Sequence, residues 1–198
     1  MTINKSNSLV ILDWDNTLFP STWVTKNNIN LNDIEIRNRY LDFFSELDDQ
    51  IYRLLQQILE YSKVIIITNA LPIWVKISSS VLPKTQYLLR RIKVISARKN
   101  FQRVTTDAFE WKKLAFQEEV EKELNIENTQ NIISIGDAAY EYKALINLYD
   151  KKRLLKSMKF LEEPSHRILQ DQIEVLNDNI VQIIKHPKHL DLIFKTVD

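Results

Sequence analysis

The chain has 198 residues, 44% of them hydrophobic and 10% aromatic, which predicts one domain over residues 1–198 with a full core. Its 27 basic and 26 acidic side chains nearly cancel, so charge gives no reason to expect nucleic acid as a partner. The lack of cysteine excludes disulfides and thiolate chemistry, and the single glycine, Gly136, excludes glycine-rich nucleotide-binding loops. No apolar run approaches the roughly 18 residues of a membrane span, so we expect a soluble, cytoplasmic protein without a signal peptide.

Strand-like and helix-like segments alternate along the chain. Apolar runs rich in β-branched residues predict strands at 9–12, 64–67, 94–95 and 132–135, with a weaker fifth strand around 154–160. Helical spacing of apolar residues predicts helices at 40–61, 73–82, 109–124 and 140–148, and a final helix at about 165–186, capped by Ser165. The alternation is typical of right-handed crossovers. It predicts an α/β fold, a Rossmann-like doubly wound parallel sheet with helices on both faces.

Polar side chains stand where these strands end, which is where doubly wound sheets bind their ligands. Asp13 and Asp15 close the first strand on the same side, and their carboxylates repel unless a cation or a proton lies between them. The polar residues at the other strand ends, and in the helix after the third strand, are Thr68, Asn69, Lys112, Lys113, Asp137 and Glu141. Carboxylates, a hydroxyl and an ammonium that converge on one edge would suit a divalent cation and a phosphate.

The motifs DWDNT at 13–17, Thr68, the helix lysine and GDAAYE at 136–141 resemble the four ordered motifs of the haloacid dehalogenase (HAD) superfamily. They extend over about two thirds of the chain. The resemblance implies that Asp13 is a nucleophile that forms an aspartyl-phosphate, and that Asp15 acts first as an acid and then as a base. It also implies a Mg²⁺ ion held by Asp13, the Asp15 main-chain carbonyl and Asp137. The acid at position 15 favours phosphatase or phosphomutase chemistry over dehalogenation.

The remaining motif residues receive supporting roles from the same resemblance. Thr68 and the Asn69 amide would hold phosphate oxygens, and Glu141 would orient a lysine or a metal-bound water. Lys112 would neutralise charge on the phosphate and on the nucleophile. On a helical wheel Lys112 and Lys113 flank the apolar face about equally, so Lys112 is chosen by resemblance and not by periodicity.

The intervals 13–68 and 68–112 leave no room for a lid domain once their predicted helices are placed, so no cap, or a minimal one, is expected. An open site accepts large substrates, and the chain resembles the capless, magnesium-dependent protein-tyrosine-phosphatase type. Five aromatic residues adjoin the motifs and could contact a phosphotyrosine ring: Trp14, Phe19, Trp23, Trp74 and Tyr140. Trp23 is the preferred wall of the substrate site, because it lies in the flap after the first motif. The alternatives are a small-molecule phosphomonoesterase, for sugar, nucleotide or lipid head-group phosphates, and an inactive HAD-fold binding module.

Residues 61–106 carry a one-sided charge. No acidic residue occurs between Tyr61 and Thr106, while nine are basic: Lys63, Lys76, Lys84, Arg90, Arg91, Lys93, Arg98, Lys99 and Arg103. The segment is therefore predicted to form an electropositive face that attracts a phosphorylated protein substrate. It also suits peripheral contact with an anionic membrane. The sequence gives no indication of the oligomeric state.

Overall fold

The fold was determined from a computed structural model that describes residues 3–124 and 130–195, and it confirms the α/β class. Its strands are β1 (Ser8–Leu12), β2 (Lys63–Thr68), β3 (Lys93–Ser96), β4 (Gln130–Gly136), β5 (Arg153–Lys159) and β6 (Leu190–Ile193). All pairs are parallel, and the six strands of the described residues form one sheet in the order β3-β2-β1-β4-β5-β6. The strand order reverses between β1 and β4, so the crevice of this Rossmann-like sheet lies at their carboxyl ends.

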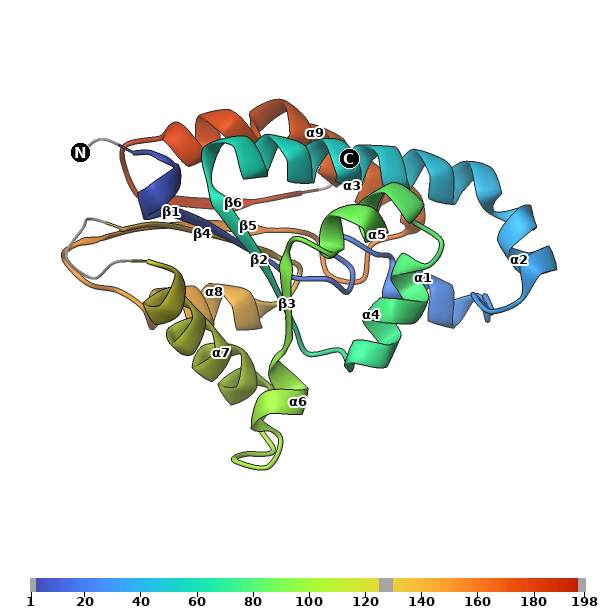
Figure 1. Ribbon diagram of the computed structural model, residues 1–198, viewed down its shortest axis with the longest axis horizontal. Helices are drawn as coiled ribbons and strands as arrows, with labels where there is room; N and C mark the ends of the chain where they lie inside the picture. The colour runs from blue at the N-terminus through green and yellow to red at the C-terminus, as the bar shows by residue number, and fades with distance from the viewer. Residues whose placement is uncertain (1–2, 125–129, 196–198) are drawn as a thin grey trace.

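Helices cover both faces of the sheet (Figure 1). The helices are α1 (Ser21–Lys26), α2 (Ile34–Arg39), α3 (Leu41–Tyr61), α4 (Pro72–Ser79), α5 (Pro83–Leu89), α6 (Ala97–Phe101), α7 (Ala108–Glu123), α8 (Ala139–Ile146) and α9 (His166–Lys185), after a 3₁₀ turn, η1 (Lys5–Asn7). The long helices α3 and α9 pack against each other on one face, and α7 packs beside α8 on the other. The predicted cap of α9 is confirmed, because the Ser165 hydroxyl accepts from the Ile168 main-chain N–H at 3.2 Å.

Strand β1 lies at the centre of both hydrophobic cores. Val10 and Leu12 join the core beneath α3 and α9, whereas Leu9 and Ile11 join the core beneath α7 and α8. Every residue of β1 is buried. Successive side chains of a strand point to opposite faces, so a strand covered on both faces must be apolar throughout. Burial of β1 on both faces therefore explains the uninterrupted apolar run before Asp13.

The structure corrects the sequence prediction at three places. The predicted helix 73–82 is α4, which already ends at Ser79. The next helix, α5, was not predicted; it begins at Pro83, which has no N–H to continue α4 and is favoured at the first position of a helix. The four-residue strand β6 was not predicted; it is a short edge strand with three exposed residues, so it lacks the apolar run of the central strands. The short helices α1, α2 and α6 were also missed, since five or six residues carry too little periodicity.

The two intervals in which a cap could be inserted are built from helices. The β1–β2 connection holds α1, α2 and α3, and the β2–β3 connection holds α4 and α5. Residues 13–62 and 69–92, all described, contain no second sheet. Among the residues that the structure describes, no helix is both long enough and apolar enough to cross a membrane.

Candidate active site

The carboxyl ends of β1, β2 and β4 meet at the crevice and bring three predicted site residues to one edge. The main-chain N–H of Asp13 donates to the Ile135 carbonyl at 2.9 Å, so the β1–β4 ladder continues to the aspartate itself. Thr68 is the last residue of β2, and Asp137 directly follows β4. All three residues are buried, and Asp13 is only 6% exposed. A carboxylate this buried requires a partner.

That partner is Lys112, which reaches the crevice from α7. Its Nζ donates to Asp13 Oδ1 at 2.6 Å, to Glu141 Oε1 at 2.6 Å and to the Ile67 carbonyl at 2.8 Å. These three bonds use all three ammonium protons. Lys113 instead pairs with Glu110 of its own helix at 3.2 Å, with its side chain 29% exposed. The structure therefore places Lys112, and not Lys113, among the motif carboxylates.

The site holds more negative charge than positive charge. Burial raises the pKa of Asp13 well above its ordinary value, although the Lys112 ammonium opposes the shift. The carboxylates of Glu141, Asp15 and Asp137 raise the pKa of Asp13 further. Burial, followed by Glu141, raises the pKa of Asp137 to about 7. Burial alone would lower the pKa of Lys112, but Asp13 and Glu141 outweigh it and raise that pKa. Two carboxylates bind the Lys112 ammonium and two more lie near Asp13, so the site has a deficit of positive charge.

Asp15 is held by side chains that the motif comparison did not include. Its Oδ1 accepts from the Trp74 indole N–H at 2.7 Å and from the Ser21 hydroxyl, while its Oδ2 lies 3.3 Å from Thr68 Oγ1. Trp74 was predicted only as an aromatic neighbour of the site, and Ser21 was not considered. No sequence pattern marks them, because their contact with Asp15 depends on how α1 and α4 pack at the sheet edge.

Gly136 leaves the space that Glu141 occupies. A Cβ atom on Gly136 would lie 2.3 Å from Glu141 Cγ, 2.6 Å from its Cδ and 2.8 Å from its Oε2. The same Glu141 carboxylate accepts from the Ala138 main-chain N–H at 3.2 Å and binds Lys112. The single glycine of the chain therefore allows Glu141 to fold back along the end of β4 and hold the lysine. The predicted orienting role of Glu141 agrees with this contact.

Two of the predicted binding residues have other contacts. The Asn69 side-chain amide donates to the Ala108 carbonyl at 3.1 Å, and so ties the start of α7 to the end of β2. Trp23 packs in an aromatic cluster, with ring centroids 5.5 Å from Tyr40, 5.2 Å from Phe43 and 4.3 Å from His166. These rings come from the start of α3 and from α9. The contacts favour a packing role for Trp23 over the predicted wall of the substrate site.

The oxygen atoms at the crevice suit Mg²⁺, a hard cation that takes one or two protein carboxylates and keeps several waters. Asp13 and Asp137 supply carboxylates, and the Asp15 main-chain carbonyl is the third predicted ligand. Across residues 3–124 and 130–195, no three His, Cys, Asp or Glu side chains lie close enough to form a ready metal cage. A Mg²⁺ ion here would rely on two carboxylates, a carbonyl and water, and its charge would offset the excess of carboxylates.

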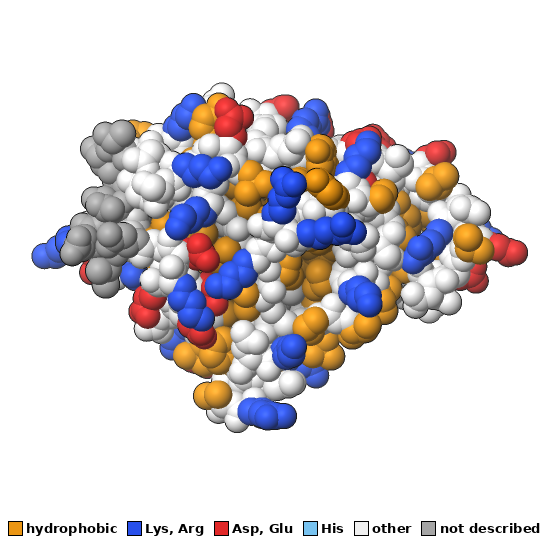
Figure 2. All heavy atoms as spheres, viewed as in Figure 1, with side chains coloured by type: hydrophobic (Ala, Val, Ile, Leu, Met, Phe, Trp, Pro, Cys, Tyr) orange, Lys and Arg blue, Asp and Glu red, His pale blue; other side chains and the backbone are white. Residues whose placement is uncertain are grey.

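The basic segment is partly neutralised by acids from other parts of the chain. Lys63 lies 3.8 Å from Glu123, and Lys84 and Lys93 pair with Asp49 and Glu119. The six other basic residues of the segment are exposed: Lys76, Arg90, Arg91, Arg98, Lys99 and Arg103. Figure 2 shows Lys and Arg side chains spread over the face that carries α5 and β3 in Figure 1. The predicted electropositive face is thus weaker than the sequence count suggested.

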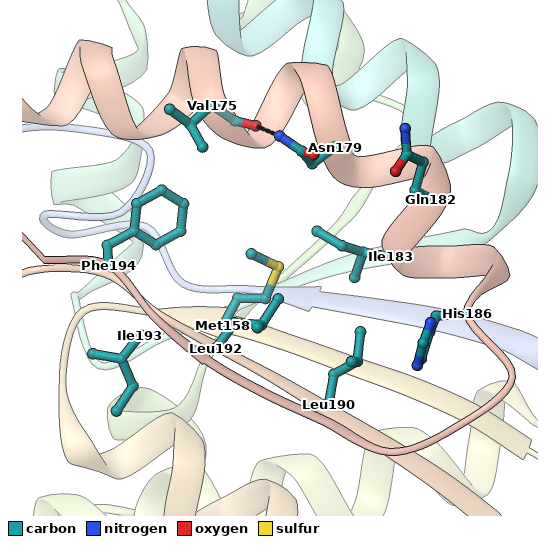
Figure 3. A pocket seen from close by; sticks show the side chains of 10 residues that line it. All are labelled: Met158, Val175, Asn179, Gln182, Ile183, His186, Leu190, Leu192, Ile193 and Phe194. Carbon is teal, nitrogen blue, oxygen red and sulfur yellow. Dashed lines mark hydrogen bonds between the residues drawn. The ribbon is translucent and has the colours of Figure 1, made fainter.

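A separate pocket of about 400 Å³ lies between α9 and strands β5 and β6 (Figure 3). Its lining includes Met158, Ile183, Leu190 and Phe194, and most of it is apolar. None of the predicted site residues lines it. This pocket therefore has no titratable pair or metal ligand set comparable with that of the crevice.

No protein-family model matches the sequence, and no curated protein is significantly similar to it. The chemistry of the site therefore has to be inferred from the residues gathered at the crevice. Those residues are a buried lysine, the carboxylates around it and the hydroxyl of Thr68.

Proposed function

We propose that the protein is a Mg²⁺-dependent phosphatase of the HAD type, which hydrolyses phosphomonoesters through an aspartyl-phosphate on Asp13. The observation that carries the proposal is the buried Lys112, bonded to Asp13 and Glu141, with Asp137 and Asp15 beside Asp13 at the switch point of a doubly wound sheet. Such a cluster costs stability, because like charges repel away from water. A role in binding a cation and a phosphate would explain why the protein contains this cluster despite its cost in stability.

The first chemical step would be attack by Asp13 on phosphorus. A carboxylate oxygen forms a bond to phosphorus while the bond to the leaving oxygen breaks, and Asp15, protonated, gives its proton to that oxygen. In the second step Asp15 takes a proton from water, and the water oxygen displaces Asp13 from phosphorus. Lys112 would neutralise charge beside Asp13, and the Thr68 hydroxyl would hold a phosphate oxygen. Bound Mg²⁺ would supply further charge neutralisation.

For the phosphate contact predicted at Asn69, the main-chain N–H is the better donor. One N–H of the Asn69 side-chain amide is already bonded to the Ala108 carbonyl, which fixes the direction of that amide. A main-chain donor at a strand end is held rigidly, which favours binding of charge that develops during the reaction.

The favoured substrate is a phosphorylated protein, with phosphotyrosine preferred. The exposed basic residues around α5 and α6 would attract such a substrate. Ile73 and Tyr140, 59% and 41% exposed, lie at the starts of α4 and α8, the helices that follow the motif strands β2 and β4. A small-molecule phosphomonoesterase is the second candidate, because the same cluster would hydrolyse any phosphomonoester that reaches it. An inactive binding module is the third candidate. It would usually lack a nucleophile or a metal ligand, whereas Asp13 and Asp137 are both present.

Hydrolysis of 4-nitrophenyl phosphate tests the proposal. The wild type should be active with Mg²⁺ and inactive in excess chelator, and Asp13→Asn should lose about 10³-fold or more in kcat. Asp178→Asn, which changes an exposed acid of α9, is the matched control and should keep full activity. Full activity of the Asp13 variant would overturn the proposed nucleophile.

Peptide substrates then separate the candidate functions. Higher kcat/KM for a phosphotyrosine peptide than for a phosphoserine peptide supports the protein-tyrosine-phosphatase candidate. Equal values, together with faster hydrolysis of a sugar or nucleotide phosphate, would favour the small-molecule candidate.

A further inference from the structure

We infer that Trp74 and Ser21 are positioning residues for Asp15, and that they leave Oδ2 as the oxygen that transfers the proton. The inference rests on the proposed function for the role of Asp15. Trp74 belongs to α4 and Ser21 to α1, so the two donors approach the carboxylate from different elements. Both donate to Oδ1, and they also lie 3.1 Å from each other.

The two oxygens of Asp15 have different surroundings. Oδ1 accepts the Trp74 indole N–H at 2.7 Å and the Ser21 hydroxyl, so its lone pairs are engaged. Oδ2 faces Thr68 Oγ1 at 3.3 Å, which is a longer contact. Thr68 is the proposed holder of a phosphate oxygen, so Oδ2 points toward the proposed phosphate site. A carboxylate fixed through one oxygen presents the other in a constant direction.

The indole N–H of Trp74 is itself held in place. Its ring packs edge-on against Phe19, with centroids 6.0 Å apart and an interplanar angle of 79°. A second tryptophan bond anchors the same helix, because the Trp14 indole N–H donates to Ser78 Oγ of α4 at 2.8 Å. Helix α4 is therefore fastened to the first motif at two points. This explains how a residue far along the chain can keep a constant distance to Asp15.

The main chain around Asp15 is fixed in the same way. Asn16 adopts a left-handed conformation with φ of 56°, and its main-chain N–H donates to the Phe19 carbonyl at 2.7 Å. The Asn16 side chain accepts from the Thr22 N–H at 3.0 Å, which ties the turn to α1. The turn thus places Ser21 close to Asp15. The fixed main chain sets the position of Asp15, and two side-chain donors set the orientation of its carboxylate.

Leaving groups of different basicity test the positioning role. A general acid matters most when the leaving oxygen is a strong base, because such an oxygen cannot depart unprotonated. Trp74→Phe keeps an aromatic ring, although a smaller one, and removes the indole N–H. It should lower kcat/KM about tenfold for phenyl phosphate and less than twofold for 2,4-dinitrophenyl phosphate. Ser21→Ala should likewise lower kcat/KM more for phenyl phosphate than for 2,4-dinitrophenyl phosphate.

The matched control is Trp111→Phe, which removes another indole hydrogen bond, of 2.7 Å to the Thr105 carbonyl. This variant should keep the wild-type ratio of the two substrates. Equal losses on both substrates in Trp74→Phe and Ser21→Ala would overturn the inference, since a general structural defect does not discriminate between leaving groups.

A second readout needs no metal and no activity. The indole N–H resonance of Trp74, identified by its loss in Trp74→Phe, should move in the ¹H–¹⁵N spectrum of Asp15→Ala, while that of Trp111 stays in place. An unmoved Trp74 resonance would also overturn the inference. A wild type without any phosphatase activity would refute the proposed function, whereas the spectrum would still decide whether Trp74 binds Asp15.

Discussion

Alanine at position 136 should destabilise the protein by forcing Glu141 away from the buried lysine. The added Cβ would lie 2.3 Å from Glu141 Cγ, well under the 3.0 Å that real Cβ atoms keep. The nearest atom is Cγ and not the end of the side chain, so rotating the carboxylate alone gives no relief. Glu141 must change rotamer, and its 2.6 Å bond to Lys112 and its 3.2 Å bond to Ala138 would break.

The expected cost combines two effects. Overpacking a dense interior costs about 1–3 kcal/mol, and loss of a hydrogen bond to a charged group costs about 1.5–3 kcal/mol. Because the rotamer change relieves part of the overpacking, we expect Gly136→Ala to lower the free energy of unfolding by about 3 kcal/mol. For a chain of this size that corresponds to a decrease of roughly 6–12 °C in Tm.

A double-mutant cycle with Glu141→Ala isolates this contact. Glu141→Ala removes all three atoms that the new Cβ would meet, so Gly136→Ala should then cost less than about 1 kcal/mol. The free energy of unfolding of all four proteins can be measured by urea denaturation. Equal costs of Gly136→Ala in both backgrounds, within about 0.5 kcal/mol, would refute the steric explanation.

Three further predictions test other parts of the structure. Lys112→Met leaves two buried carboxylates unpaired, so it should lower the free energy of unfolding, measured by urea denaturation, by about 3–5 kcal/mol and abolish hydrolysis. Lys113→Met is the control and should stay within about 0.5 kcal/mol of wild type. Similar effects of the two substitutions would contradict the assignment of Lys112 as the lysine of the site. Trp23→Ala should lower the unfolding free energy by about 3 kcal/mol and leave KM for an aryl phosphate unchanged; a raised KM in a stable variant would restore Trp23 as a substrate wall. Burial lowers the pKa of Lys156 from 10.5 to about 8, so between these pH values the unfolded chain binds more protons than the folded protein. The stability that Lys156 contributes is present above pH 10.5 and is lost as the pH falls to 8. The difference in unfolding free energy between wild type and Lys156→Met, taken as wild type minus variant, should therefore increase from pH 8 to pH 10.5. A decrease of this difference would contradict the predicted sign.

The sequence alone determined strands β1 to β5, the long helices and the carboxylates at the strand ends. A strand covered on both faces has to be apolar along its length, so β1, β2 and β4 are visible as runs. Parallel strands place their carboxyl ends at one edge, so the sequence is enough to assign Asp13 and Asp137 to the same site. This part of the prediction depends on local patterns and on the topology that they allow.

Tertiary structure decided the contacts within the site. Lys112 and Lys113 are equivalent on a helical wheel, and only the docking of α7 directs Lys112 into the crevice. The contact of Trp74 with Asp15 likewise depends on how α4 packs against the first motif, and the short edge strand β6 depends on its pairing with β5. Periodicity records which side of an element is buried, because burial selects residue type. It does not record which atoms meet across two elements, because that depends on the distance and angle at which the elements pack.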